Sequence, residues 1–189
     1  MSLSAFLLVA MASVARAQPQ PNASEVATLR AGEVVVREAP ARKAGAIRVE
    51  AFVDVAAPPD RAWAALTDYA ARVRGSSSLE GYAIYRDDPA TPCVRWWGGR
   101  FGVDVAFHNC YVLSPDRRKL TYTLDPDPAR ASDMLYSVGT YVLEAIAGGT
   151  RLTYEGETQF KGAVPGFAQR WLAEGGTREY MEDLRRRAQ

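Results

Sequence analysis

The segment from Val49 to Tyr69 constrains the fold more than any other part of the chain. Polar and apolar residues largely alternate along Val49–Val55, which is the period of a β-strand with one covered face. The pair Pro58-Pro59 ends the strand, and Asp60 adds negative charge to the first turn of a helix. Apolar residues then recur at helical spacing. The segment therefore predicts a strand that leads directly into a short amphipathic helix.

The first seventeen residues have the pattern of a cleaved secretory signal. An apolar core from Leu3 to Ala15 ends in Ala15-Arg16-Ala17, which fits the small-residue cleavage pattern. The core is shorter than the roughly 20 residues of a membrane-spanning helix. No Lys or Arg precedes it, so a buried helix or a membrane anchor is the alternative. We expect a signal peptide at residues 1–17 and a periplasmic or secreted protein.

Length and charge define the class of protein that remains. About 170 residues after the signal make one ordinary domain, which we divide into an N-terminal lead-in (18–46) and a ligand-binding domain (47–187). The 23 basic and 22 acidic residues balance to a net charge of +1. A chain with this balance has no strong net electrostatic field that would attract nucleic acid, and we expect no nucleic-acid partner.

The two cysteines leave the question of a disulfide open. An even count in an oxidising compartment favours a bridge between Cys93 and Cys110. A tight turn at Gly98-Gly99 would instead place Cys93 opposite Asp104, with Cys110 about 20 Å away, whereas a bridge needs Cα atoms within about 7 Å. We therefore expect free cysteines, unless the loop is longer or differently registered. Two cysteines and one histidine are too few for a structural zinc site, and we predict no metal and no cofactor.

The remaining segments predict a curled antiparallel sheet and one long helix. Residues 24–46 suggest a mobile or loosely packed lead-in with a short extra strand at 33–37, and residues 70–79 suggest a second short helix or turn. Turn residues then separate predicted strands at 81–87, 93–97, 101–113, 119–125, 137–147 and 151–160. Pro165 opens a helix at 166–187. The prediction is an α+β fold in which about seven strands wrap around the C-terminal helix, with two short helices after the first strand.

Strand parity selects the side chains that face this helix. Pairing Leu113 with Leu120, and Leu143 with Tyr154, gives the sheet one wet face and one covered face. The covered face is rich in aromatic residues, and the C-terminal helix adds Phe167 and Trp171. The candidate ligand-binding residues are Trp96, Phe107, Asn109, Tyr111, Tyr122, Tyr141, Tyr154, Phe160, Phe167 and Trp171.

Two features favour a cavity over a filled core. Buried phenols need hydrogen-bond partners from protein, water or ligand. Gly175-Gly176 also interrupts the long helix, where each glycine costs about 1 kcal/mol relative to alanine. We expect a kink that opens space between helix and sheet, or a helix that breaks in two.

Particular motifs resemble a known superfamily. The segment "RAWAALTDY" after a Pro-Pro strand end, and "GGTRLTYEGETQFKGAVPGFAQRW" near the C-terminus, are similar to START-like domains of the polyketide cyclase and coenzyme Q-binding group. The resemblance covers about residues 47–187 and implies the helix-grip fold, which encloses a hydrophobic cavity. The sequence departs from the family after "LTDY", where it reads AARVRGSSSLEG instead of an aromatic and proline-rich segment.

Support for catalysis in the sequence is weak. The single histidine, His108, falls on the outer face by parity, where we expect a surface or edge residue, so no Ser-His or Cys-His arrangement forms around the cavity. Asn109 is the one strongly polar residue on the inner side of its strand. We expect a binding protein, and possible transport, for a lipid, quinone or polyketide, with transient membrane contact allowed.

Two alternatives stay open. The first is a cyclase or dehydratase acting on an aromatic or polyketide substrate, which an inward ionisable residue near Asn109 or Tyr111 would favour. The second is an interaction module whose cavity is filled by its own side chains, which a cavity below roughly 300 Å³ would favour. The ligand and the oligomeric state do not follow from the sequence.

Overall fold

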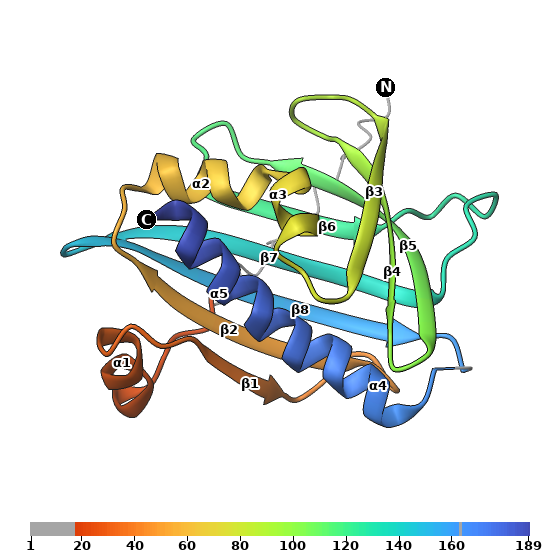
Figure 1. Cartoon of the computed structure of the whole chain (residues 1–189), viewed down its shortest axis with the longest axis horizontal. Coiled ribbons are helices and arrows are strands. Elements are labelled where there is room, and N and C mark those ends of the chain that lie inside the picture. The colour runs from red at the N-terminus through yellow and green to blue at the C-terminus, as the bar shows by residue number, and fades with distance from the viewer. Residues whose placement is uncertain (1–17, 163) are drawn as a thin grey trace, which may run out of the picture.

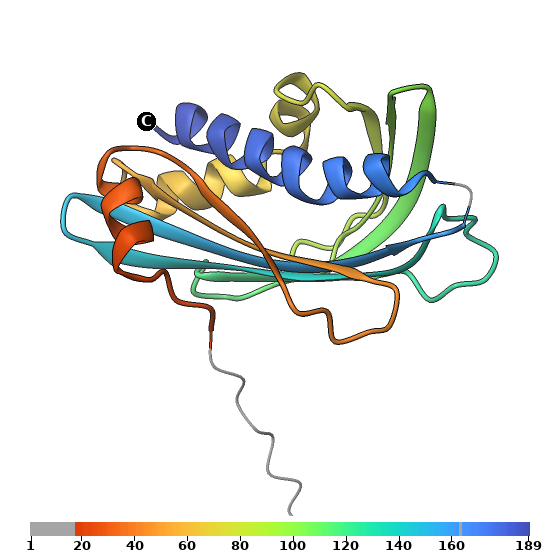
Figure 2. The ribbon, with the colours of Figure 1, turned by 90° about the horizontal axis from the view of Figure 1, so that it is seen from below.

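The structure is a computed structural model that describes residues 18–162 and 164–189. The predicted signal peptide therefore lies outside the described residues. Within them, one open antiparallel sheet of eight strands, in the order β1-β2-β8-β7-β6-β5-β4-β3, curls around a long C-terminal helix (Figure 1, Figure 2). This α+β helix-grip architecture confirms the predicted fold class, with one strand more than expected.

The strands are β1 (Val35–Ala39), β2 (Ile47–Val55), β3 (Leu79–Arg86), β4 (Cys93–Arg100), β5 (Val103–Leu113), β6 (Lys119–Leu124), β7 (Met134–Ile146) and β8 (Gly149–Phe160). The helices are α1 (Ala23–Arg30), α2 (Pro59–Thr67), α3 (Tyr69–Arg74), α4 (Gly166–Arg170) and α5 (Gly176–Ala188), with a π-helical turn η1 (Trp171–Gly175) between α4 and α5. Among the described residues, no helix is both long and apolar enough to span a membrane.

Helix α2 begins as its sequence predicts. Pro59 lies at the first helical position, where its fixed φ suits the helix and its missing N–H costs nothing. Trp63 and Leu66 are buried against the core, while Arg61 and Ala64 face solvent. The short helix expected in residues 70–79 is α3, and its N-cap Asp68 accepts a hydrogen bond from the backbone N–H of Ala71. Both helices lie beside α5 on the same face of the sheet (Figure 1).

The C-terminal helix lies across the concave face of the sheet (Figure 2). Met181 and Leu184 are fully buried, as expected for the residues that cover the sheet. The helix neither breaks nor ends at Gly175-Gly176, because both glycines keep helical dihedral angles and η1 joins α4 to α5. The irregularity that we expected there is a π-helical turn, in which one extra residue is accommodated without loss of the helix.

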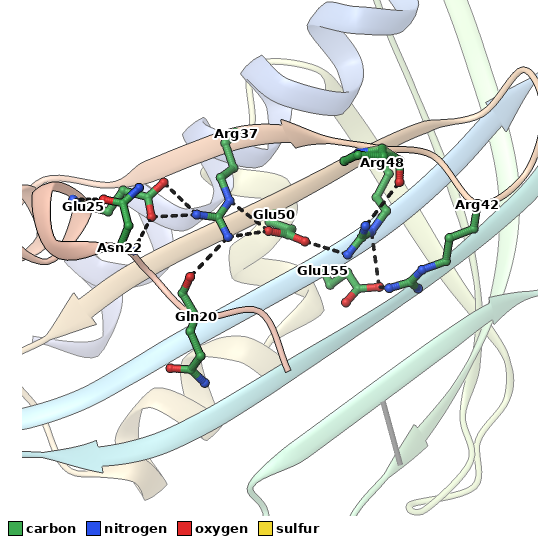
Figure 3. Close-up of polar contacts among 9 residues, drawn as sticks. Gln20, Asn22, Glu25, Arg37, Arg42, Arg48, Glu50 and Glu155 are labelled. Carbon is green, nitrogen blue, oxygen red and sulfur yellow. Dashed lines mark hydrogen bonds and ion pairs between the residues drawn. The ribbon is translucent and has the colours of Figure 1, made fainter. Parts of the chain in front are cut away.

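The N-terminal lead-in is packed, contrary to the expectation of a mobile or loose segment. Helix α1 begins with a capping box in which Asn22 and Glu25 satisfy each other's backbone N–H groups. Strand β1 pairs with β2. Arg37 then joins α1, β1 and β2, because its guanidinium bonds Glu25 and Glu50, each at 2.7 Å (Figure 3). Composition suggested a loop, but these ion pairs fix the segment to the edge of the sheet.

The hairpin of β4 and β5 differs from its predicted form. The turn lies at Phe101-Gly102, where both residues have positive φ values of 57° and 73°, as a two-residue hairpin turn requires. Gly98 and Gly99 are strand residues, and a Cβ on Gly98 would collide with the backbone of the neighbouring strand β3. The shifted turn places Cys93 directly opposite Cys110.

Cys93 and Cys110 form a disulfide, with Cα atoms 4.1 Å apart. The sequence left this bridge open and favoured free cysteines only for a turn at Gly98-Gly99, and the observed turn at Phe101-Gly102 gives the different register that a bridge requires. Both sulfurs also lie near an Asp125 oxygen. Since disulfide sulfur carries no thiolate, these three residues do not form a metal-ligand set.

The hairpin of β7 and β8 is shifted by two residues from its predicted register. Leu143 pairs with Leu152, and Tyr141 pairs with Tyr154, because the turn is centred on Ala147-Gly148, with Gly148 at a φ of 86°. A shift of two residues keeps every side chain on its predicted face. The tyrosines therefore still face the helix.

Candidate functional site

A cavity of about 150 Å³ lies between the concave face of the sheet, α3 and the C-terminal helix. This volume is below the roughly 300 Å³ of typical ligand pockets, and it equals that of cavities that hold a benzene-sized group. Aromatic and aliphatic side chains form most of its wall. By volume alone, the cavity therefore favours the alternative of a core largely filled by its own side chains, and the case for a ligand depends on the chemistry of the cavity wall.

Seven of the ten predicted site residues line this cavity. They come from β5, β6, β7 and β8, and they are Phe107, Asn109, Tyr111, Tyr122, Tyr141, Tyr154 and Phe160. These side chains share one face of the sheet because side chains alternate between the two faces along each strand. The hairpin turns lie elsewhere than predicted, but this alternation is unchanged.

Three predicted site residues lie away from the cavity wall. Trp96 is fully buried behind it, and its indole N–H donates to the Tyr111 hydroxyl at 2.9 Å. Phe167 is 66 % exposed at the start of the C-terminal helix. Trp171 packs against Phe101 beyond the cavity, with ring centroids 5.4 Å apart. Residue spacing alone did not show which face of the C-terminal helix turns toward the sheet. The positions of Phe167 and Trp171 were therefore predicted wrongly.

The tyrosines form a continuous aromatic cluster along the cavity. Tyr141 stacks on Tyr154 with ring centroids 4.5 Å apart, and it also contacts Tyr122 and Tyr180. The hydroxyls of Tyr122 and Tyr154 bond each other at 2.8 Å. Among the described residues, the Tyr141 hydroxyl has no hydrogen-bond partner, so this phenol is available to a ligand.

Burial raises the pKa of these phenols above the ordinary tyrosine value. For Tyr141 and Tyr122, burial is the main cause, and neighbouring tyrosines add to the rise in pKa. The phenols therefore stay neutral at physiological pH. They can donate and accept hydrogen bonds to orient a ligand, whereas they are poor bases.

Sequence reasoning missed two charged groups in the cavity wall, Arg72 of α3 and Asp183 of α5. Asp183 is buried and is held by Arg187 at 2.7 Å and by Arg186 at 3.3 Å. Charged residues in a short helix are usually exposed, so composition gave no reason to place Arg72 inward. The available signal was its position three residues after Tyr69, on the same helix face.

Two polar atoms of the cavity residues are unsatisfied. The Asn109 Oδ1 and the Arg72 Nε are both buried without a hydrogen-bond partner among the described residues. Most buried polar groups in native proteins are paired. A polar group of a ligand, or a water molecule, in the cavity would satisfy both atoms.

Gly176 lines the cavity from the helix. A Cβ at this position would meet no atom within 4 Å, although alanine would stabilise the helix by about 1 kcal/mol. Gly175 is different, since its Cβ would approach the Trp171 Nε1 to 2.8 Å. Close packing therefore accounts for Gly175 but not for Gly176, which has open space beside it in the cavity wall.

His108 lies on the convex face of the sheet, as parity predicted, but it is buried and not at the surface. Its ring packs edge-on against Tyr85 with centroids 5.6 Å apart. Burial lowers its pKa, and the cations Arg95 and Arg130 lower the pKa further. His108 thus lies on the opposite side of the sheet from the cavity.

Known proteins and structures were compared with the whole chain. No curated protein sequence matches it. Among solved structures, the aromatase/cyclase Zhui from Streptomyces sp. R1128 is similar, with a TM-score of 0.64 and 19 % identity over 76 % of this chain and 93 % of that one. A STAR-related lipid transfer protein from Xanthomonas axonopodis has a TM-score of 0.64 and 15 % identity over 81 % of this chain and 93 % of that one.

A START superfamily protein from Mycobacterium smegmatis has a TM-score of 0.56 and 18 % identity, covering 72 % of this chain and 92 % of that one. At these identities the structures show a shared fold. The sequence profile of the family described as "Polyketide cyclase / dehydrase and lipid transport" matches residues 46–189. That match, together with the helix-grip fold, means that the chain belongs to the polyketide cyclase/dehydrase and lipid transport family.

Proposed function

We propose that this protein binds a small hydrophobic molecule in the cavity between the sheet and the C-terminal helix, in the periplasm or outside the cell. The observation that carries the proposal is Gly176, a helical glycine in the cavity wall at which an added Cβ would meet open space. The neutral phenols supply an apolar wall with hydrogen-bonding edges. The unsatisfied Asn109 Oδ1 adds a polar contact that can orient the ligand.

The first test is native mass spectrometry of the protein purified from its native host, compared with a denatured sample. We expect a bound mass that is lost on denaturation and that gives the class of ligand. Lipids, quinones and polyketides all combine an apolar body with a few oxygen atoms, and a cavity of about 150 Å³ holds a part of such a molecule about as large as one aromatic ring.

A matched pair of glycine variants makes this test specific for the cavity. Gly176→Leu places a side chain into the open space, and it also improves helix propensity, so we expect a folded protein without the bound mass. Gly166→Leu is the control, because Gly166 is exposed and a Cβ there also meets nothing within 4 Å. Retention of the ligand by Gly176→Leu would contradict the proposed site.

A second candidate function is catalysis of polyketide cyclisation or dehydration in the same cavity. The observation that favours it is Arg72, an ionisable side chain in the cavity wall alongside Tyr111. A fixed cation can stabilise the negative charge that develops on an enolate oxygen. Chromatography with mass spectrometry separates the two functions, since a carrier returns its ligand unchanged. Dehydration lowers the mass of the substrate by one water molecule, whereas cyclisation alone gives an isomer of equal mass that chromatography resolves.

A further inference from the structure

Arg72 holds its guanidinium at the cavity wall between two aromatic rings. Its Cζ lies 4.7 Å from the centroid of the Trp96 ring and 4.3 Å from that of the Tyr180 ring. Such contacts attract a cation to the faces of the rings. Because the rings engage the planar group from two elements, β4 and α5, they restrict its orientation and leave its N–H groups to find acceptors elsewhere.

No acceptor is present for these N–H groups in the described part of the chain. The Nε is completely buried and unpaired, and the guanidinium forms no ion pair within 4.0 Å. Other partly buried arginines differ, since Arg37 bonds Glu50 and Arg151 bonds Asp54, each at 2.7 Å. Arg37 and Arg151 therefore each have a carboxylate partner, whereas Arg72 has none among the described residues.

Asp183 does not fill this role. It is the one acidic residue among those lining the cavity in the described structure, and its two carboxylate oxygens are engaged by Arg186 and Arg187. A Cβ on Gly75 would overlap the Asp183 carboxylate, so the glycine fixes that carboxylate against α3. The cavity wall therefore carries one unneutralised positive charge.

The charge of Arg72 persists at every physiological pH. Burial acts to lower its pKa, but Tyr180 and the other surrounding tyrosines act in the opposite direction, and the pKa lies above the ordinary arginine value. Arg72 is half-buried, and its Nε is closed off from solvent without an acceptor, which costs free energy. A ligand that brings an anionic oxygen would remove that cost, and the bond would be stronger than one between neutral groups.

We infer that Arg72 is the recognition site for the carboxylate of a small apolar acid, whose hydrocarbon part occupies the tyrosine-lined cavity. The inference rests on the proposed function and narrows its ligand class from hydrophobic molecules to apolar carboxylic acids. The cavity volume of about 150 Å³ sets the size of the apolar part at about one aromatic ring. Asn109 and the free Tyr141 hydroxyl offer hydrogen bonds to any further oxygen on the ligand.

The test compares two probes of the same shape, hydrocinnamate and the neutral hydrocinnamyl alcohol, by isothermal titration calorimetry at neutral pH. We expect the acid to bind about tenfold more tightly than the alcohol, as a charge-assisted bond to guanidinium allows. Arg72→Gln should abolish this preference and leave the affinity for the alcohol within about a factor of two. Arg74→Gln is the matched control, because it removes the same charge from an exposed position of the same helix.

A second measurement uses the unsubstituted protein, so that the test does not depend on the correct folding of Arg72→Gln. Nitrogen-15 NMR of arginine side chains should show the Arg72 Nε–H signal shifting downfield with hydrocinnamate and much less with the alcohol, because the Nε gains an acceptor. Equal affinity for both probes, with no Nε shift, would overturn the carboxylate inference and leave the hydrophobic binding protein intact. Failure of both probes, together with no bound mass in the native protein, would overturn both.

Discussion

The hydroxyl oxygens of Tyr122 and Tyr154 lie 2.8 Å apart in the wall of the cavity, next to a cross-strand pair of glycines. Gly139 pairs with Gly156 in the β7–β8 ladder. A Cβ on Gly139 would lie 2.5 Å from the Tyr122 ring, and one on Gly156 would overlap the Tyr154 hydroxyl. The two glycines therefore make the room in which two phenols from different strands can bond.

Gly156→Ala should disrupt this arrangement. The new methyl group displaces the Tyr154 phenol, which breaks its bond to Tyr122 and leaves buried hydroxyls unpaired. We expect a loss of about 1–3 kcal/mol in the free energy of unfolding, measured by chemical denaturation. Gly162→Ala is the control, since its Cβ would meet nothing within 4 Å. Equal stability of the two variants would mean that the phenols move aside without cost.

The disulfide between Cys93 and Cys110 should stabilise the β4–β5 hairpin against unfolding. It closes a loop with a sequence separation of 17, for which chain entropy gives about 3 kcal/mol. The double variant Cys93→Ala/Cys110→Ala should therefore melt at a lower temperature than the unsubstituted protein. A reducing agent should lower the melting temperature of the unsubstituted protein and leave that of the double variant unchanged. If the reductant affects both equally, its effect does not come from this bond.

Arg37 should anchor the N-terminal segment to the sheet. Its guanidinium bonds Glu25 of α1 and Glu50 of β2, so Arg37→Met breaks both links and keeps an unbranched apolar side chain in place of the arginine stem. We expect a loss of about 1 kcal/mol and faster hydrogen exchange in residues 18–39. Arg30→Met is the control, because Arg30 is exposed in the last turn of α1. Unchanged exchange in Arg37→Met would show that β-pairing alone holds the segment.

The fold and most of the cavity wall could be predicted from the sequence, because both depend on which side chains of each strand face the helix, and that follows from the alternation of residues along the strand. Tyr141 and Tyr154 face the cavity whether the last hairpin has the predicted or the observed register, since a shift of two residues preserves the face. The turn of the β4–β5 hairpin was not predictable from glycine alone. Phe101 adopts a positive φ that side chains seldom take, and the glycines that suggested a turn serve close strand packing.

Arg72 could not be placed from the sequence for a different reason. A charged residue in a short helix is normally solvated, and the stacking on Trp96 and Tyr180 depends on contacts between segments far apart in the chain. The segment AARVRGSSSLEG, which departs from the family pattern, contains this residue. Under the proposed recognition of a carboxylate by Arg72, this segment sets the ligand preference of the chain.

The buried His108 should make stability fall at mildly acid pH. Burial and the nearby cations Arg95 and Arg130 lower its pKa in the folded state, against a smaller opposite effect of Asp125. In the unfolded chain His108 therefore gains a proton near pH 6.5, the ordinary histidine value. In the folded chain His108 gains its proton only at a lower pH. By linkage, the contribution of His108 to stability is present above about pH 6.5 and is lost as pH falls from there through the folded-state pKa.

His108→Gln keeps a neutral polar group at this position and cannot gain the proton. We expect its free energy of unfolding to change less between about pH 7 and pH 5 than that of the unsubstituted protein, because most carboxylates titrate below this range. Denaturation at several pH values measures the two slopes. Tyr85→Phe is the control, since it keeps the edge-on ring beside the histidine and removes the hydroxyl bound to Asp125. Identical slopes for His108→Gln and the unsubstituted protein would show that the histidine titrates alike in the folded and unfolded chains, and that its burial on the convex face does not disfavour the charged form.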